Sequence, residues 1–283
     1  MKKPQSAGII IDDLFKIYKR GKIEVVALRG LSCEFKRGDL SVIMGPSGCG
    51  KTTLLNLIGG LDVASSGKIL FENENISAKS EKELEFYRKT KVGYVFQFMN
   101  LIPELNAAEN VDLPLLLTNV PKKERDKRTA ELLHIVGLKD RESHNPDELS
   151  GGEQQRVAIA AALAHNPDIL LCDEPTGELD TESKYEIMGV LKHVLKEFPH
   201  KIILVVTHDP DLRKIADKLF FIKDGEISFE LEKSEIVEKY GESADFDPEE
   251  TISSERFFKE YHELEYMIRD KLERFAKKHK EKN

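Results

Sequence analysis

A glycine-rich run at residues 45–52 has the residue types and the spacing to bind phosphate groups. It follows a predicted strand and precedes a predicted helix. Its glycines let the backbone wrap phosphates, while its amides and the helix N-terminus offer them positive potential. We expect Lys51 to reach the β and γ oxygens of a nucleotide and the Thr52 hydroxyl to ligate Mg²⁺, the alternative being an ordinary glycine-rich turn. The candidate nucleotide-binding residues of this P-loop are Gly45, Pro46, Ser47, Gly48, Cys49, Gly50, Lys51, Thr52 and Thr53.

An acidic pair follows the apolar run at residues 169–172. Since strands of a parallel sheet end at the edge where a P-loop lies, Asp173 is placed to hold Mg²⁺, usually through water. Glu174 comes one residue later and is placed to polarise a water in line with the γ-phosphate, as a general base. The alternative is an ordinary acidic strand end.

Two further motifs carry polar groups suited to a phosphate. The apolar run 202–206 ends in Thr207-His208-Asp209, where the imidazole of His208 can bond a γ-phosphate oxygen and the attacking water. The run Ser150-Gly151-Gly152 opens a predicted helix and forms a second anion site. A single nucleotide rarely needs both loops within one subunit. We therefore expect two copies to face head to tail, with each P-loop against the partner's Ser-Gly-Gly.

The elements that position these groups alternate between strands and helices. Predicted strands occupy residues 9–11, 25–28, 31–35, 40–44, 68–71, 92–96, 169–172 and 202–206. Predicted helices occupy residues 52–58, 80–89, 181–198 and most of 100–165. The runs 169–172 and 202–206 are continuously apolar, as strands buried on both faces of a parallel sheet require. The pattern predicts an α/β fold.

Composition narrows the class of protein. The 283 residues include 43 basic and 51 acidic side chains, for a net charge of −8, so we expect no nucleic-acid partner. No apolar run approaches the roughly 18 residues of a membrane-spanning helix, and the run 9–11 is too short for a signal peptide. Three cysteines without metal spacing indicate a reducing compartment, so we expect a cytoplasmic location.

These motifs together resemble the ATP-binding subunit of ABC transporters, over about residues 8–230. They follow the family's order: P-loop 45–52, glutamine loop at Gln97, signature 149–153, Asp-Glu pair 173–174, D-loop 177–180 and switch histidine His208. The resemblance implies a P-loop NTPase core with a RecA-like, mainly parallel sheet and an N-terminal antiparallel β subdomain. It also implies an inserted α-helical subdomain at about 98–165. We expect an ATP-binding domain at 1–232 and a C-terminal helical extension at 233–283.

The resemblance also implies the partners and the remaining site residues. ATP and Mg²⁺ bind between two copies of the chain, and each dimer serves an integral-membrane permease. The signature residues Ser150, Gly151 and Gly152 act in trans on the γ-phosphate, and Glu153 after them is a further candidate nucleotide-binding residue. Gln97 corresponds to the residue that touches Mg²⁺ and the attacking water, Tyr18 to the aromatic that stacks on adenine, and Asp180 to an organiser of the dimer seam. The alternatives are a polar strand end for Gln97 and a half-buried strand tyrosine for Tyr18.

A narrower resemblance concerns the runs 44–48, 55–62, 96–103 and 108–114. They are similar to the subgroup that serves lipoprotein release, macrolide export and antimicrobial-peptide export or sensing. Ala161 departs from this subgroup, which commonly has Arg there, and Glu153 replaces the commoner Gln. The apolar segment 99–117 is the candidate surface for coupling to the permease, or alternatively the core of the helical subdomain.

The expected function is ATP hydrolysis coupled to a permease, with the subunit held at the inner face of the cell membrane by that partner. One alternative is a regulatory or sensing ATPase, in cell division or peptide sensing, without net transport. Another is an ABC ATPase that acts on DNA, which the acidic balance and the absence of a long coiled coil between the P-loop and the signature disfavour.

The last residues carry a separate prediction. Residues 241–250 read as an acidic linker, and from Ser253 the chain reads as one charged helix with an apolar stripe. The stripe comprises Phe257, Tyr261, Leu264, Ile268, Leu272 and Phe275. Packing on its own domain, self-association and contact with a membrane partner are the alternatives for it.

Overall fold

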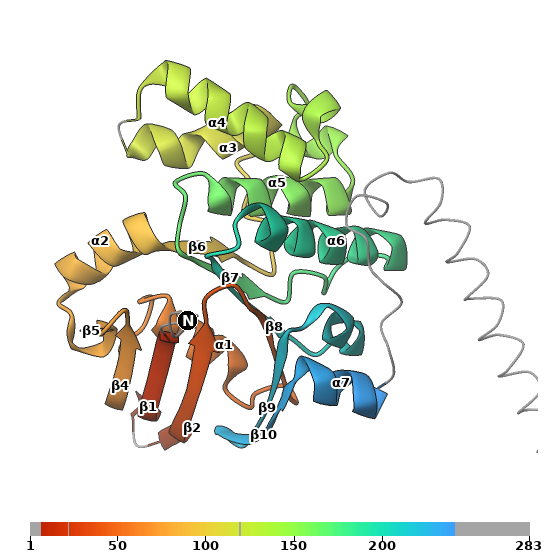
Figure 1. The fold of residues 1–283 in the computed structure, drawn as a ribbon. Coiled ribbons are helices and arrows are strands. Elements are labelled where there is room, and N and C mark those ends of the chain that lie inside the picture. Colours follow the sequence, from red (N-terminus) through yellow and green to blue (C-terminus); the bar gives the residue numbers. More distant parts are fainter. Residues whose placement is uncertain (1–6, 22, 119, 241–283) are drawn as a thin grey trace, which may run out of the picture.

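Two β-sheets and the helices packed on them form the computed structural model, which describes residues 7–21, 23–118 and 120–240 (Figure 1). The strands are β1 (Ala7–Arg20), β2 (Ile23–Lys36), β3 (Leu40–Met44), β4 (Ser66–Phe71), β5 (Glu74–Asn75), β6 (Val92–Val95), β7 (Ile169–Asp173), β8 (Ile202–Thr207), β9 (Lys218–Lys223) and β10 (Glu226–Glu232). The helices are α1 (Lys51–Ile58), α2 (Glu81–Lys91), α3 (Ala107–Leu117), α4 (Lys122–Ile135), α5 (Gly151–Leu163), α6 (Thr181–Glu197) and α7 (Lys233–Tyr240). The predicted acidic linker and C-terminal helix lie outside the described residues.

The larger sheet has six strands in the order β10-β9-β3-β8-β7-β6. All neighbours from β9 to β6 pair in parallel, and β10 pairs antiparallel with β9. Every residue of β3 and β8 is buried because helices or the second sheet cover both faces. This confirms the mainly parallel sheet. It also places the carboxyl ends of β3, β7 and β8 side by side.

Two apolar clusters lie on opposite faces of this sheet. One face packs against α1, α2 and the smaller sheet, through side chains such as Leu55, Tyr87 and Phe35. The other face packs against α5 and α6, through side chains such as Ile159 and Val190. The sheet therefore separates α1, with the P-loop before it, from α5, with the signature residues before it (Figure 1).

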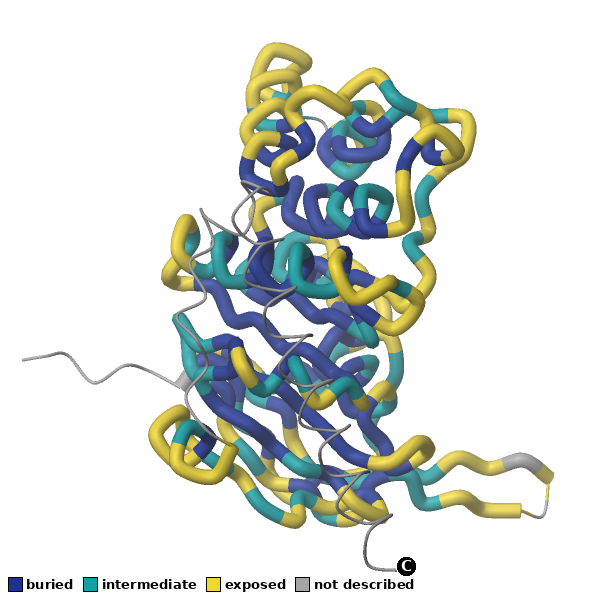
Figure 2. The backbone as a smooth tube through the Cα atoms, turned by 90° about the vertical axis from the view of Figure 1, so that its right-hand side faces the viewer, coloured by how far each residue is buried: buried dark blue, intermediate teal, exposed yellow. Residues whose placement is uncertain are grey.

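The smaller sheet is antiparallel, in the order β2-β1-β4-β5, as expected of an N-terminal antiparallel β subdomain. The sequence pattern predicted separate short strands at 25–28 and 31–35. That boundary is wrong, because β2 is continuous. Its pairing with β1 shifts register at Leu14 and Phe15, and Gly30 opposite takes a φ of 72°. Gly30, which the sequence pattern treats as a turn residue, therefore lies at a bulge inside a continuous strand. Figure 2 shows the exposed end of this hairpin projecting beyond the buried interior.

Helices dominate residues 100–165, as predicted. α3, α4 and α5 contact one another and α5 also contacts α6, which joins this helical part to the larger sheet. Pro121 is the N-cap of α4, and Gly137, at a φ of 73°, follows the end of this helix. Among the described residues, no helix is long and apolar enough to cross a membrane. α7 packs on β9 and β10 and buries Ile236.

Candidate functional site

The P-loop connects β3 to α1, and its glycines are required by close contacts. A Cβ on Gly45 would lie 2.1 Å from the carbonyl oxygen of Ile222, and one on Gly50 would lie 2.5 Å from that of Ala27. Gly48 has open space around it but takes a φ of 77°, which favours glycine. Packing therefore fixes the two ends of the loop, while the backbone at its centre stays uncovered on the exposed side.

Lys51, Thr52 and Asp173 meet at this edge of the sheet. The Lys51 ammonium donates to the carbonyl oxygens of Gly45 at 2.9 Å and Pro46 at 3.1 Å, inside the loop. The exposed Thr52 hydroxyl donates to the Asp173 carboxylate at 3.1 Å. Burial raises the pKa of Asp173, and the charge of Glu174 adds to that effect. A hydroxyl and a carboxylate side by side are hard oxygen donors, so this pair fits Mg²⁺, and the uncovered loop fits a triphosphate.

Glu174 and His208 are brought together although 34 positions separate them in the sequence. The Glu174 amide donates to the Val206 carbonyl at 2.8 Å, and its φ of 48° turns the chain away from β7. One carboxylate oxygen of Glu174, Oε1, lies 2.9 Å from His208 Nδ1. The other, Oε2, accepts hydrogen bonds from the Thr207 hydroxyl at 3.0 Å and from the His208 amide at 3.2 Å. A candidate base and a candidate phosphate contact thus share one hydrogen-bonded group.

Tyr18 lies close to Thr53, in the first turn of α1. Its hydroxyl donates to Asp62 at 2.8 Å, and burial raises its pKa. The Lys16 ammonium lies 4.8 Å from the ring centroid and binds the same Asp62 carboxylate at 2.5 Å. The ring remains 41% exposed, so it can present a face to a ligand beside the P-loop. Sequence reasoning missed Lys16 and Asp62, because only the folded chain brings them to Tyr18.

Gln97 lies in the bend that follows β6 and is exposed. A Cβ built on Gly177 would lie 4.0 Å from Gln97 Nε2 and 3.5 Å from the Cβ of Glu174. The Gln97 amide is therefore close to the D-loop and to Glu174. Its predicted contact with Mg²⁺ and water stays a prediction.

The signature residues lie apart from the P-loop of the same chain. Ser150 caps α5, where its hydroxyl accepts from the Glu153 amide at 3.2 Å and its own amide donates to the Glu153 carboxylate at 2.8 Å. Arg141 binds the second oxygen of that carboxylate at 3.0 Å. Glu153 is thus turned back onto its own helix N-terminus, a capping box that the Ser-x-x-Glu spacing could have revealed.

The D-loop and α6 pack directly against the signature. A Cβ on Gly152 would lie 2.7 Å from the Ser183 hydroxyl oxygen, and one on Gly151 would lie 3.4 Å from Leu179. Asp180 caps α6 by accepting from the Ser183 amide at 3.0 Å. The structure therefore places Asp180 next to the signature of its own chain.

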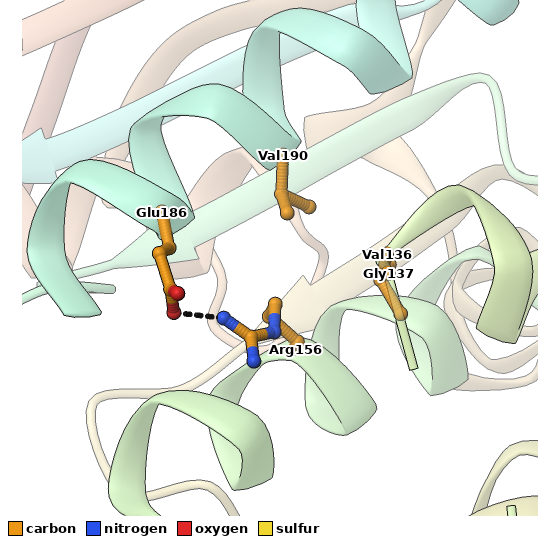
Figure 3. Close-up of a pocket in the computed structure, with 5 residues that line it drawn as sticks. All are labelled: Val136, Gly137, Arg156, Glu186 and Val190. Atoms are coloured by element: carbon orange, nitrogen blue, oxygen red, sulfur yellow. Dashed lines mark hydrogen bonds and ion pairs between the residues drawn. The ribbon is translucent and has the colours of Figure 1, made fainter. Parts of the chain in front are cut away.

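An ion pair strengthens the junction of the signature helix with α6. Figure 3 shows Arg156 of α5 and Glu186 of α6 pointing toward one another across a small pocket, and the two side chains form an ion pair. Arg156 is 12% exposed, so Glu186 supplies the counter-charge for a largely buried guanidinium.

A groove of about 300 Å³ lies between the segment that follows β6 and the helical part. Its lining includes Phe96, Met99, Ile102, Pro114 and Ala161. Apolar side chains stand exposed in the same part of the chain, with Phe98 at 69% and Leu117 at 66% exposure. Most of the predicted coupling segment 99–117 therefore borders a surface, although Val111 and Leu115 belong to the core.

Comparison with known proteins points to one family. The sequence model of the ABC transporter family matches residues 28–177. An uncharacterised ABC transporter ATP-binding protein of Thermotoga maritima is 47% identical over 215 residues, covering 76% of this chain and 91% of that protein. The lipoprotein-releasing system ATP-binding protein LolD of Bacteroides fragilis is 44% identical over 207 residues, covering 73% of this chain and 94% of LolD.

A solved structure has the same fold at similar identity. It is a dimeric post-hydrolysis state of the ATP-binding cassette MJ0796 of Methanocaldococcus jannaschii, bound to ADP and Pi. The TM-score is 0.72 at 40% identity, and the match covers 80% of this chain and 98% of that one. Both the fold and the candidate chemistry are thus those of a nucleotide-hydrolysing cassette.

Proposed function

We propose, since the chain belongs to the ABC transporter family, that it is the ATP-hydrolysing subunit of a transporter whose permease exports or releases lipoprotein, macrolide or peptide. The chain is an ATPase that binds ATP with Mg²⁺. One observation carries the proposed assignment of its site: Lys51, Thr52, Asp173, Glu174 and His208 converge at the carboxyl edge of β3, β7 and β8. The subgroup is supported by the motif resemblance of the sequence and by the similarity to LolD, whose name is that of a lipoprotein-releasing system.

The residues of this edge divide the work of hydrolysis. The backbone amides of the P-loop and Lys51 bind the phosphates and offset their charge. Thr52, Asp173 and Gln97 would hold Mg²⁺, and the bound ion stabilises negative charge on the phosphate oxygens. Glu174 accepts a proton from the attacking water, and His208 contacts the γ-phosphate. Tyr18 stacks on the adenine.

A second copy of the chain completes the site. Ser150, Gly151 and Gly152 lie across the sheet from their own P-loop, so they are placed to meet a nucleotide on a facing copy. The Glu153 carboxylate then bonds its own helix instead of the phosphate. Support comes from the similar MJ0796 cassette, which was solved as a dimer with ADP and Pi.

The groove beside α3 is the proposed docking surface for the permease. It joins the segment that carries Gln97 to the signature helix, which provides Ala161 to its lining. Docking there would hold the chain at the inner face of the cell membrane. A regulatory or sensing complex without net transport would use the same ATPase, and it is distinguished by whether ATP turnover moves a substrate.

The Glu174→Gln variant tests the proposed site. Because the amide cannot take a proton from water, we expect hydrolysis to fall at least about a hundredfold while ATP binding persists, which traps a dimer. Hydrolysis at the parent rate would contradict the assignment of the base. Size-exclusion chromatography with ATP, alongside phosphate release, reads both properties.

The same variant, tagged, serves as bait in native membranes solubilised in mild detergent with ATP and Mg²⁺. We expect it to retain a stoichiometric membrane protein. Adding Ala161→Glu should release that protein, since it puts a carboxylate in the groove, whereas Ala130→Glu adds the same group at an exposed position of α4. A trapped dimer that brings down no membrane protein would overturn the transporter role.

A further inference from the structure

We infer that Thr207 is a positioning residue for ATP hydrolysis: its buried hydroxyl fixes one oxygen of the Glu174 carboxylate and leaves the other to face the reacting water. The inference rests on the proposed role of Glu174 as the base. Thr207 makes this contact from the end of β8, one residue before the switch histidine.

The Thr207 hydroxyl has a defined direction. The residue is fully buried, and its backbone is held in the sheet opposite Met44 of β3. Its oxygen accepts a hydrogen bond from the Asp209 amide at 2.9 Å. With that donor on one side, the hydroxyl proton points to Glu174 Oε2, 3.0 Å away. Asp209 is itself held by an ion pair with Lys184 of α6, at 2.7 Å.

The two oxygens of the Glu174 carboxylate are held differently. Oε2 accepts from the Thr207 hydroxyl and the His208 amide, both of which belong to the end of β8. Among the residues that the structure describes, Oε1 contacts only the ring of His208, a side chain that is 68% exposed. A turn of that ring toward a phosphate would leave Oε1 facing water while Oε2 kept both of its donors. Oε2 is therefore the anchored oxygen and Oε1 the working oxygen.

Anchoring matters because Glu174 lies beyond the paired part of β7. Its positive φ directs the side chain across the end of β8, and rotation about its side-chain bonds would carry the carboxylate away from the water. A carboxylate that is already held in the reactive orientation does not have to be ordered before the reaction. A small displacement of a catalytic group from that position lowers the reaction rate strongly. The hydroxyl thus acts on the chemical step through Glu174.

Four variants isolate the hydroxyl. Thr207→Val keeps the shape of the side chain and removes the hydroxyl, whereas Thr207→Ser keeps the hydroxyl. Thr207→Ala is compared with Thr207→Ser, from which it differs only by the loss of the hydroxyl. We expect Thr207→Val to lower kcat about tenfold with KM for Mg-ATP within about twofold, and Thr207→Ser to stay near the parent. Thr129→Val is the matched control, because that buried hydroxyl of α4 has no hydrogen-bond partner among the described residues.

The outcomes separate this inference from the proposed function. If Glu174→Gln abolishes hydrolysis but Thr207→Val leaves kcat unchanged, the base stands and the positioning role is overturned. Equal losses in Thr207→Val and Thr207→Ser, or a change confined to KM, also overturn it. Should Thr207→Val fail to fold, the comparison of Ser with Ala decides: a kcat about tenfold lower for Ala supports the role, and equal values refute it.

Discussion

Tyr18 presents a partly exposed ring beside the P-loop, with Lys16 at 4.8 Å from its centroid and its hydroxyl on Asp62. If the ring stacks on adenine, Tyr18→Ala removes about 1 kcal/mol of binding, which is about a fivefold rise in the Kd for ATP. Tyr18→Phe keeps the ring and loses only the hydrogen bond to Asp62, so its Kd should stay within about twofold. Calorimetric titration measures both, and equal affinities for the parent and the alanine variant would exclude stacking.

At the residue scale, the sequence predicted which residues belong to the site better than it predicted the hydrogen bonds between them. The P-loop, the Asp-Glu pair and His208 were predicted because each motif sits at a predicted strand end, and the structure brings them together. The hydrogen bond of Thr207 to Glu174 could not be predicted, because it depends on β7 and β8 being adjacent and in register.

At the scale of elements, an ion pair adds to the apolar packing at the junction of α5 with α6. Glu186→Gln leaves the Arg156 guanidinium without its counter-charge in a site where it is 12% exposed. We expect the free energy of unfolding to fall by about 2 kcal/mol, as measured by urea denaturation.

Glu182→Gln, one turn earlier on α6, is the control for that variant. Burial and then the charges of Glu186 and Asp180 raise the pKa of Glu182, so loss of its charge relieves repulsion. We expect its effect to stay within about 0.5 kcal/mol. Equal destabilisation by both substitutions would mean that the Arg156–Glu186 pair contributes nothing specific.

The sequence predicted whether a segment is a helix or a strand better than it predicted where that helix or strand begins and ends. The apolar runs 169–172 and 202–206 were predicted as buried strands because four or five consecutive apolar residues suit a strand that is covered on both faces of a sheet. The sequence predicted shorter strands in place of β1 and β2, because Asp12-Asp13 and Gly30 are residues typical of turns. In the structure these residues lie at bulges within the paired strands. β9 and β10 were missed although the sequence carries their signals: β9 contains the apolar run Leu219–Ile222, and β10 alternates polar and apolar residues after the Asp224-Gly225 turn.

For the whole molecule, the fold class was predictable and the order of strands was not. Alternation of strands and helices around a P-loop predicts an α/β sheet, but it does not say that β3 lies between β9 and β8. That order puts the P-loop beside the end of β8, where His208 follows. The placement of the signature across the sheet likewise depends on which face α5 covers.

The opposite edge of the sheet holds a buried amine that sequence did not single out. Lys201 is fully buried just before β8, where its ammonium donates to Asn166 Oδ1 at 2.9 Å and to the Pro167 carbonyl. Burial lowers the pKa of Lys201 to about 8, and the nearby charge of Arg128 adds to that effect. Folding therefore disfavours the protonated amine of Lys201. The resulting loss of folding stability is fully present below about pH 8.

This cost should make the stability of the whole molecule depend on pH in the alkaline range. The unfolded amine keeps its proton up to its ordinary pKa of 10.5, so the unfolded chain binds more protons than the folded chain between about pH 8 and 10.5. The free energy of unfolding therefore rises with pH in that range. For the parent relative to Lys201→Met, we expect a gain of about 1 kcal/mol in the free energy of unfolding between pH 8 and pH 9. Urea denaturation of both proteins at the two pH values measures it. The other titratable groups are the same in the parent and in Lys201→Met, so their effects cancel when the two free energies of unfolding are subtracted. If the free energies of both proteins changed equally with pH, Lys201 would have its ordinary pKa in the folded chain.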